Sequence, residues 1–336
     1  MRSELRVSIG KKSGNQTELN SRIRGQSQKI MGTHSTHESP QLDIAVRVGC
    51  KLSYSVNNDV PTFAILKPQQ APTQSIRQES IQLSNDCSVT EYRDEHGNVI
   101  YRLMLAPGQH YLTYDAIVHV PSVREDTFWN DAPVPIDKLP SDILRYTQPS
   151  RYCDSDRLAN FAWDKFGHLP SGLPRILEIC EWIHANIEYR TGSGSPFITA
   201  NDVIERGYGV CRDFAHCAVA LCRAMNLPAR YVSGYVSDIA WLDDGRPMDF
   251  HAYTEVWMDN RWQTFDARFL KPRVGRVRIS SGYDAGSCAF GTFFGPTLLQ
   301  YFEVWSYQID PRNIRVGDPV DLSQRLCGKL ELTRPV

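Results

Sequence analysis

A cysteine at the start of a predicted helix is the side chain with the clearest chemical potential. Between residues 207 and 225, two glycines form a turn and apolar residues then recur at helical spacing, which predicts a helix whose first turn holds Cys211. A thiol there faces unpaired backbone N–H groups and the positive end of the helix dipole, and both favour the thiolate. A lone free cysteine is more often a small core residue, so the role of Cys211 depends on its partners.

Those partners lie downstream, in a predicted β-hairpin that carries His251 and Asp266. Two alternating, aromatic-rich runs flank the Asp-Asn pair at residues 259–260, which favours a hairpin loop of even length. If Met258 pairs with Arg261, His251 and Asp266 become diagonal neighbours on one face, about 7–8 Å apart, and the carboxylate can orient the imidazole. A slip of one residue would place them on opposite faces.

Cys211, His251 and Asp266 together supply a nucleophile, a general base and a carboxylate that orients the base. This set follows the logic of catalytic triads extended beyond serine, in which the base takes the thiol proton and returns it to the leaving group. The structural alternative is a core histidine and an aspartate at a hairpin edge, and the combined set favours function over it. The sequence therefore predicts a cysteine-based triad.

In these residues the chain resembles the transglutaminase-like superfamily, in particular its bacterial-type members. The resemblance covers residues 150–280 strongly and residues 41–120 weakly, and it implies a papain-like catalytic domain behind a β-rich domain. It is specific for the fold and the triad but not for the reaction, because this superfamily includes amide hydrolases, cross-linking acyltransferases and inactive relatives. Four segments carry it: Gly-Val-Cys211-Arg-Asp-Phe-Ala, Leu-Pro-Ala-Arg-Tyr-Val-Ser-Gly-Tyr235, His251-Ala-Tyr-Thr-Glu-Val-Trp257 and Phe-Asp266-Ala-Arg.

The resemblance also implies a role for Tyr189, which lies where the family carries an aromatic donor for the oxyanion. Attack on an amide creates an oxyanion that needs two donors, and the backbone N–H of Cys211 and the Tyr189 hydroxyl would supply them. The alternative is a half-buried tyrosine at a helix end, and the sequence does not decide between the two. Asp213, by contrast, is better explained as a complement to the helix dipole than as a catalytic residue, with Arg212 as its surface or cleft-edge neighbour.

The 336-residue chain is long enough for two domains, and its pattern predicts an α+β fold. Short alternating runs predict an antiparallel β-sandwich at residues 41–120. Five prolines mark residues 121–150 as a linker over the surface. Helices and strands then build the catalytic domain at 151–310. Residues 1–40 are polar and predicted to be disordered, with Met31 an alternative start of translation, and residues 311–336 form a C-terminal tail.

Composition is typical of a soluble globular protein, with 41% hydrophobic and 22% charged residues. A formal net charge of −1 gives no electrostatic reason to expect nucleic acid or a membrane as partner. Residues 1–30 lack the apolar core of a secretory signal, so we expect a cytoplasmic protein with mostly buried thiols. We expect no cofactor and no metal, since the spacing of Cys211, Cys217 and Cys222 fits no zinc pattern. The oligomeric state stays open.

The expected reaction is hydrolysis of a peptide or carboxamide bond in a peptide or protein substrate, through a thioester on Cys211. Three alternatives stay open: a protein-glutamine acyltransferase that cross-links proteins, a glycan-releasing amidase, and a non-catalytic module that binds peptides. Transfer to an amine needs a sheltered entrance near the thiol, for which Tyr208, Tyr235, Tyr253 and Trp241 are candidate walls. No EF-hand-like acidic pattern is present, so we expect calcium independence.

Overall fold

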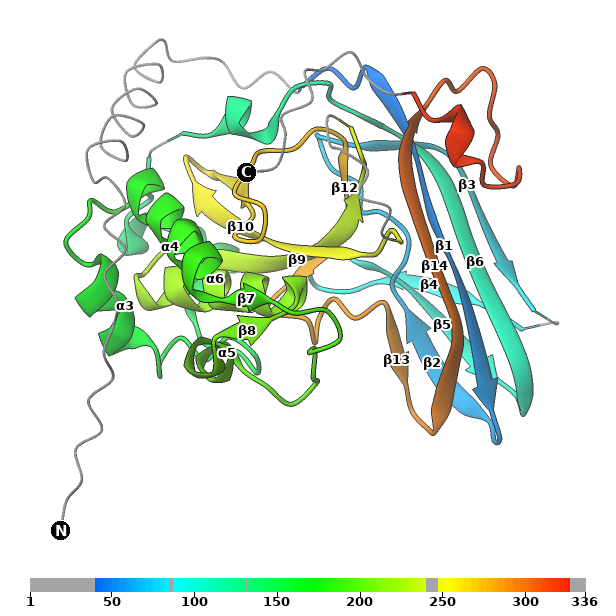
Figure 1. Cartoon of the computed structure of the whole chain (residues 1–336), viewed down its shortest axis with the longest axis horizontal. Coiled ribbons are helices and arrows are strands. Elements are labelled where there is room, and N and C mark those ends of the chain that lie inside the picture. The colour runs from blue at the N-terminus through cyan, green and yellow to red at the C-terminus, as the bar shows by residue number, and fades with distance from the viewer. Residues whose placement is uncertain (1–39, 85–86, 131, 240–246, 327–336) are drawn as a thin grey trace. The chain divides into compact units, whose positions relative to one another are not determined.

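Strands dominate the first part of the chain in the computed structural model, which describes residues 40–84, 87–130, 132–239 and 247–326 (Figure 1). They form two antiparallel sheets, which together we call the two-sheet region, ordered β14-β1-β6-β3 and β13-β2-β5-β4. Buried and exposed residues alternate along strands such as β5, because one face packs against the core. The strands are β1 (Ile44–Val56), β2 (Val60–Ala64), β3 (Ser75–Leu83), β4 (Thr90–Arg93), β5 (Val99–Leu105), β6 (Gly108–Val120), β13 (Gly291–Phe293) and β14 (Thr297–Ile309).

Two of these strands come from the other end of the chain. β14 pairs antiparallel with β1 from Ala45 opposite Ile309 to Val56 opposite Thr297, and β13 pairs with β2. The structure therefore differs from the predicted division, which assigned all residues of 151–310 to the catalytic domain. The physical reason is that β1 is buried along most of its length, so its backbone needs a partner on both edges, and β6 covers only one.

The second part of the chain places helices against a third antiparallel sheet, ordered β11-β10-β9-β12. The helices α3 and α4 precede the cysteine helix in the chain and pack against it. These elements are α3 (Ala159–Phe166), α4 (Leu173–Asn186), α5 (Ala200–Arg206), α6 (Cys211–Ala224), β9 (Ala229–Val236), β10 (His251–Met258), β11 (Arg261–Phe265) and β12 (Arg276–Gly282).

The predicted cysteine helix, α6, is the centre of this second part. It contacts α3, α4 and α5 on one side and β9 and β10 on the other, as Figure 1 also shows. Thr254 of β10 donates its hydroxyl to the carbonyl of Ala215 at 3.3 Å. Because the helix is enclosed, even its polar residues Asp213, His216 and Arg223 are buried. The amphipathic pattern thus predicted the helix correctly but did not show that its polar face is covered as well.

The segment predicted as a surface linker is packed onto the third sheet. It contains four short helical pieces, η1 (Glu125–Phe128), η2 (Ile136–Lys138), α2 (Ser141–Leu144) and η3 (Arg145–Thr147). The ring of Trp129 stacks on Phe265 with centroids 4.9 Å apart, and its indole N–H donates to the carbonyl of Thr264 at 3.0 Å. We call residues 121–150 the connecting segment from here on.

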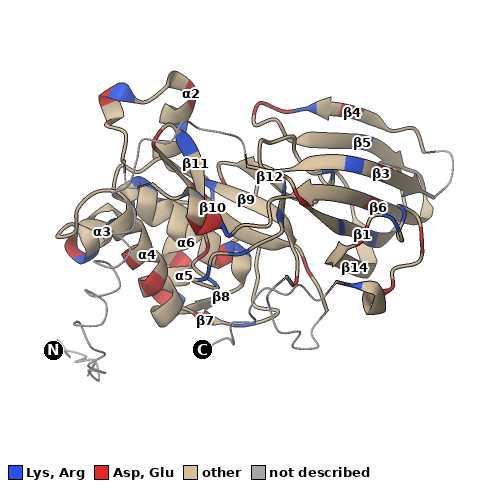
Figure 2. Ribbon diagram, turned by 90° about the horizontal axis from the view of Figure 1, so that it is seen from above, with Lys and Arg blue, Asp and Glu red and all other residues tan. Residues whose placement is uncertain are grey.

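The described residues belong to one compact unit, and the third sheet packs against the two-sheet region. Tyr235, Val277 and Ile279 of β9 and β12 join the same hydrophobic cluster as the strands β1, β2, β5 and β6. Hydrogen bonds add to this contact, since the side chain of Gln74 bonds both the backbone N–H and the carbonyl of Arg278. Acidic and basic residues are interspersed over the ribbon (Figure 2), in line with the near-zero net charge.

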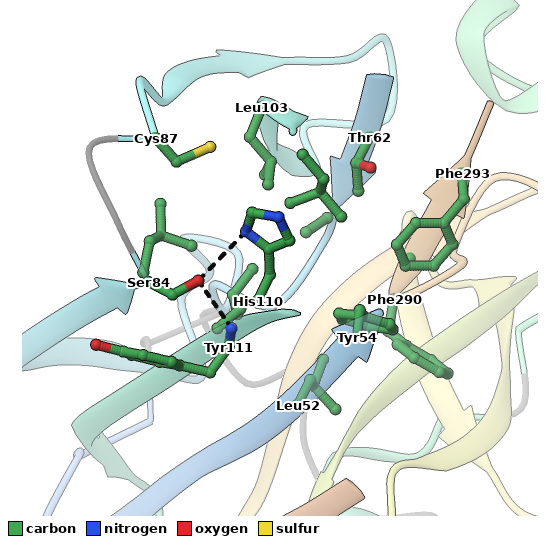
Figure 3. Close-up of a pocket in the computed structure, with 15 residues that line it drawn as sticks. Leu52, Tyr54, Thr62, Ser84, Cys87, Leu103, His110, Tyr111, Phe290 and Phe293 are labelled. Atoms are coloured by element: carbon green, nitrogen blue, oxygen red, sulfur yellow. Dashed lines mark hydrogen bonds between the residues drawn. The ribbon is translucent and has the colours of Figure 1, made fainter. Parts of the chain in front are cut away.

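An apolar crevice lies in the two-sheet region, shown in Figure 3, with His110 and Ser84 at its polar end. His110 is held by the Ser84 hydroxyl at 3.3 Å and by the carbonyl of Ala106 at 2.6 Å. The space inside is about 10 Å³, which is room for one water molecule. This volume is too small for a ligand.

The end of the described chain runs back over the fold. After β14, η4 (Leu322–Gln324) is followed by Arg325, whose guanidinium pairs with Asp238 at 3.2 Å. Residues 1–39 and 327–336, which include the predicted disordered extension and the end of the tail, lie outside the described residues. Within the described part of the chain, none of the helices combines the length and the apolar character that a membrane crossing requires.

Candidate active site

Cys211 is the first residue of α6, as predicted. A short parallel pair of strands, β7 (Glu188–Tyr189) and β8 (Tyr208–Gly209), leads the chain into this position. Val210 is extended, with φ −109° and ψ 177°, and helical geometry begins directly after it. The half-buried thiol therefore lies at the N-terminus of a 14-residue helix, where free N–H groups and the helix dipole stabilise a negative charge.

The turn before Cys211 is held by Asp213, which is fully buried. Its Oδ2 accepts the backbone N–H of Val210 at 3.0 Å and a guanidinium N–H of Arg206 at 3.1 Å, and its Oδ1 accepts from Arg212 at 2.7 Å. A Cβ on Gly209 would lie 2.7 Å from that of Asp213, so only glycine permits this approach. Asp213 thus binds the end of the helix and two arginines, a structural position.

His251 and Asp266 meet across the β10–β11 hairpin. The register places Met258 opposite Arg261 and Trp257 opposite Trp262, which confirms the predicted pairing. Nε2 of His251 lies 2.8 Å from Oδ2 of Asp266, and both side chains are buried. The predicted diagonal pair is therefore in direct contact.

Cys211 is also a neighbour of this imidazole. Its side chain lies near enough to His251 to contribute to the raised pKa of the imidazole, whose Nε2 bonds the Asp266 carboxylate. Burial works against a charge on His251, but the charge and hydrogen bond of Asp266 and the contact with Cys211 outweigh it and raise the pKa of His251 to about 9. An imidazolium at neutral pH is the partner that favours a Cys211 thiolate.

Asp266 remains ionised beside this histidine. Burial alone would raise the pKa of its carboxyl, but His251 and Arg276 hold that pKa well below its usual range. Its Oδ1 accepts the backbone N–H groups of Arg268 at 2.9 Å and Phe269 at 3.3 Å. The carboxylate is therefore both charged and fixed in orientation.

Tyr189 lies beside the turn that enters α6. On β7 it is paired with Gly209, two residues before Cys211, and its ring packs against Phe214 with centroids 6.0 Å apart. The guanidinium of Arg268 lies over this ring, 3.8 Å from its centroid. The structure thus brings Tyr189 to the neighbourhood of the nucleophile, while its role as an oxyanion donor stays a prediction.

The four aromatic residues predicted as candidate cleft walls differ in their burial. Tyr235 is buried in the core of the two-sheet region, with its hydroxyl 3.4 Å from the carbonyl of Leu66, and Tyr253 is buried beneath Arg276. Both interpretations as cleft walls were therefore wrong, because these rings lie in the interior. Tyr208 is half-buried between Arg190 and Arg206. Trp241 lies outside the described residues.

Arg276 and Glu125 are two residues of this site that sequence reasoning missed. Arg276 on β12 donates to Oδ2 of Asp266 at 3.1 Å, and Glu125 of the connecting segment binds the same guanidinium. The alternation of Arg276, Val277, Arg278 and Ile279 was a signal for the strand, but nothing local showed its partner. As for a metal, the described residues contain no group of three or more His, Cys, Asp or Glu side chains suited to hold one.

Comparison with known proteins agrees with this arrangement. Residues 164–267 match the core model of the transglutaminase-like superfamily. The crystal structure of a putative cysteine protease from Cytophaga hutchinsonii is 30% identical with a TM-score of 0.71, and the alignment covers 80% of this chain and 91% of that one. The chain belongs to the transglutaminase-like superfamily, and its helices and antiparallel sheets form a transglutaminase-like fold.

Curated relatives extend the comparison to mycobacteria. An uncharacterized protein of Mycobacterium tuberculosis is 32% identical over 112 residues, which cover 31% of this chain and 36% of that protein. An uncharacterized protein of Mycobacterium leprae is 28% identical over 89 residues, or 26% of this chain and 32% of that protein. The chain thus spans about a third of the length of these relatives.

Proposed function

We propose that the protein is a cysteine-nucleophile hydrolase that cleaves a peptide or carboxamide bond with Cys211, His251 and Asp266. The observation that carries this proposal is the imidazole of His251, whose Nε2 lies 2.8 Å from the Asp266 carboxylate and whose pKa is raised by Asp266 and by the nearby Cys211 side chain. The similarity to a putative cysteine protease points to the same chemistry. A helix that bears the nucleophile, packed on a sheet that bears the base, is also the arrangement of the papain-like prediction.

The first half of the mechanism forms a thioester. The Cys211 thiolate attacks the carbonyl carbon of the substrate, and the electron pair moves to the oxygen. The backbone N–H of Cys211 and the hydroxyl of Tyr189 stabilise that oxyanion. The C–N bond then breaks, the imidazolium of His251 gives its proton to the leaving nitrogen, and ammonia or an amine departs.

The second half restores the enzyme. Neutral His251 takes a proton from water, the hydroxide adds to the thioester, and the C–S bond breaks to release a carboxylic acid and the thiolate. Asp266 remains ionised throughout and keeps the protonated Nε2 of the imidazole directed toward itself. The catalytic cycle therefore needs no group beyond the three side chains, the oxyanion donors and water.

An experiment with two readouts tests the reaction. The protein is incubated with a library of glutamine-containing peptides and a labelled amine, and mass spectrometry follows cleavage, deamidation and amine incorporation. We expect cleavage or deamidation that Cys211→Ala abolishes and Cys87→Ala leaves intact, because Cys87 is a half-exposed thiol of the two-sheet region. Dominant amine incorporation would show an acyltransferase instead.

The non-catalytic alternative has its own test. Iodoacetamide labelling at pH 6, read peptide by peptide, should modify Cys211 faster than the other thiols, because a thiolate reacts and a thiol does not. Cys211 that reacts no faster than Cys87 would contradict the ion pair and favour a peptide-binding module.

A further inference from the structure

The carboxylate of Asp266 is shared between two cations. Its Oδ2 accepts from Nε2 of His251 at 2.8 Å and from Nη2 of Arg276 at 3.1 Å. Both partners are buried, so solvent screens neither contact strongly. The two cations therefore compete for the same negative charge, and whatever changes Arg276 changes how firmly Asp266 holds the imidazolium.

Arg276 is itself fixed by a residue far away in the chain. Glu125 of η1 binds Nε of Arg276 with one carboxylate oxygen and accepts the backbone N–H of Arg273 with the other at 3.2 Å. The backbone N–H of Glu125 donates to the carbonyl of Arg273 at 3.2 Å. The guanidinium also lies over the Tyr253 ring, 4.3 Å from its centroid. Its position is thus determined from several sides.

We propose that Arg276 and Glu125 form a positioning pair that sets how strongly Asp266 binds the imidazolium of His251. Four groups form a chain of alternating charge, Glu125 negative, Arg276 positive, Asp266 negative and His251 positive, and Cys211 is the next neighbour of His251. The positive charge of Arg276 partly offsets the negative charge of Asp266. Asp266 therefore stabilises the imidazolium less strongly, and the imidazolium can release its proton to the leaving nitrogen. Glu125 in turn partly offsets the charge of Arg276, so Asp266 still stabilises the imidazolium at neutral pH. This inference rests on the proposed function, because the proton concerned is the one that leaves with the amine.

The contacts do not favour the alternative that Arg276 and Glu125 serve only to orient the Asp266 carboxylate. Oδ1 of Asp266 already accepts two backbone N–H groups, so the carboxylate is oriented without Arg276. What Arg276 adds is a positive charge on the same oxygen that His251 uses. Other titratable or charged groups face the pair: Tyr253 on β10, Cys180 and Glu181 on α4, and Arg273, Lys271 and Asp238 in the surrounding loops.

The alternating charges predict opposite effects of two substitutions. In Arg276→Gln, Asp266 keeps its full charge for His251, and the pKa of the imidazole should rise by about one unit. In Glu125→Gln, the whole charge of Arg276 acts on Asp266, and the same pKa should fall by about half a unit to one unit. Arg276→Lys keeps the charge and should stay near wild type. Damage to the fold, in contrast, would shift the pKa of the His251 imidazole in the same direction in both variants.

The test uses the full chain and needs no substrate. NMR titration of labelled histidine gives the imidazole pKa, and His251→Gln assigns the signal. The pH dependence of Cys211 alkylation gives the highest pH at which the thiolate–imidazolium pair persists. Glu255→Gln is the matched control, since Glu255 is buried between Arg230 and Arg278 on the same sheet and should leave both curves unchanged. Shifts of the same sign in the two charge variants, or no shift in folded protein, would overturn the proposal.

A second readout separates this inference from the proposed reaction. Once a peptide substrate has been identified, Arg276→Gln should lower kcat at neutral pH about tenfold with little change in KM. Release of the proton from the imidazolium slows in this variant, whereas binding of the peptide is unchanged. If no peptide is cleaved but the two titrations shift oppositely, the positioning pair stands and the hydrolase proposal fails. If Arg276→Gln does not fold, Glu125→Gln still reports the sign of the pKa shift, and Arg276→Lys serves as the variant that keeps the charge.

Discussion

Nε2 of His251 lies 2.8 Å from Oδ2 of Asp266 across the β10–β11 hairpin, although the two residues are 15 positions apart in the chain. That one contact fixes which nitrogen of the imidazole carries a proton toward the carboxylate and which nitrogen is left to face Cys211. The register of the hairpin therefore determines which carboxylate orients the imidazole. Four predictions follow from this contact and from the groups around it.

Asp266→Asn should lower the pKa of His251 from about 9 toward its ordinary value, because burial then acts without an opposing carboxylate. The imidazole is neutral at pH 7 in that variant, so Cys211 loses its ion-pair partner. We expect the alkylation of Cys211 at pH 6 to slow at least about tenfold and turnover to fall by about 10²–10⁴-fold. Alkylation rates that match wild type at pH 6 would contradict the role of Asp266.

The stability of the fold should depend on pH through the same histidine. The pKa of His251 is raised in the folded state, from 6.5 to about 9, so its contribution is fully present below about pH 6.5 and is lost as the pH rises through 9. Urea unfolding of wild type and His251→Gln should differ more at pH 6 than at pH 9.5, by up to about 3 kcal/mol. A difference that stays constant over this range would refute the raised pKa.

Asp213→Asn should cost stability rather than chemistry. Asp213 binds two arginines and the N–H of Val210 in the buried start of α6, and its neutral variant leaves those arginines without their charge partner. We expect a loss of about 3 kcal/mol in unfolding free energy with the pH profile of Cys211 alkylation unchanged. Asp202→Asn is the matched control, because Asp202 takes the same place in the capping box of α5 and should cost only about 1 kcal/mol. Lost thiol reactivity at an unchanged melting temperature would contradict this assignment.

Tyr189→Phe tests the oxyanion donor. The ring should keep its packing on Phe214 and beneath Arg268, so the melting temperature should change little. If the hydroxyl stabilises the oxyanion, kcat should fall about 10²–10³-fold with Cys211 alkylation intact. Tyr208→Phe on the neighbouring strand β8 is the control and should keep its activity. Equal turnover in the two variants would leave the half-buried tyrosine as the correct interpretation.

Much of the site was predictable from local patterns in the chain. The helix that begins at Cys211 and the register of the hairpin that carries His251 and Asp266 follow from periods of 3.6 and 2, which neighbouring residues alone determine. Register matters most here, because a slip of one residue would separate the histidine from the aspartate.

Partners distant in the chain were decided only by the tertiary structure. Alternation shows that β1 and β14 are strands but not that they pair, because any exposed strand edge offers the same backbone donors and acceptors. Amphipathicity shows one face of α6 but not the elements that enclose the other. Arg276 and Glu125 meet Asp266 for the same reason: a charged side chain carries no information in the sequence about which opposite charge the fold will bury beside it. The sequence by itself determined which three side chains are the candidates for the site, and packing determined the charges that surround them.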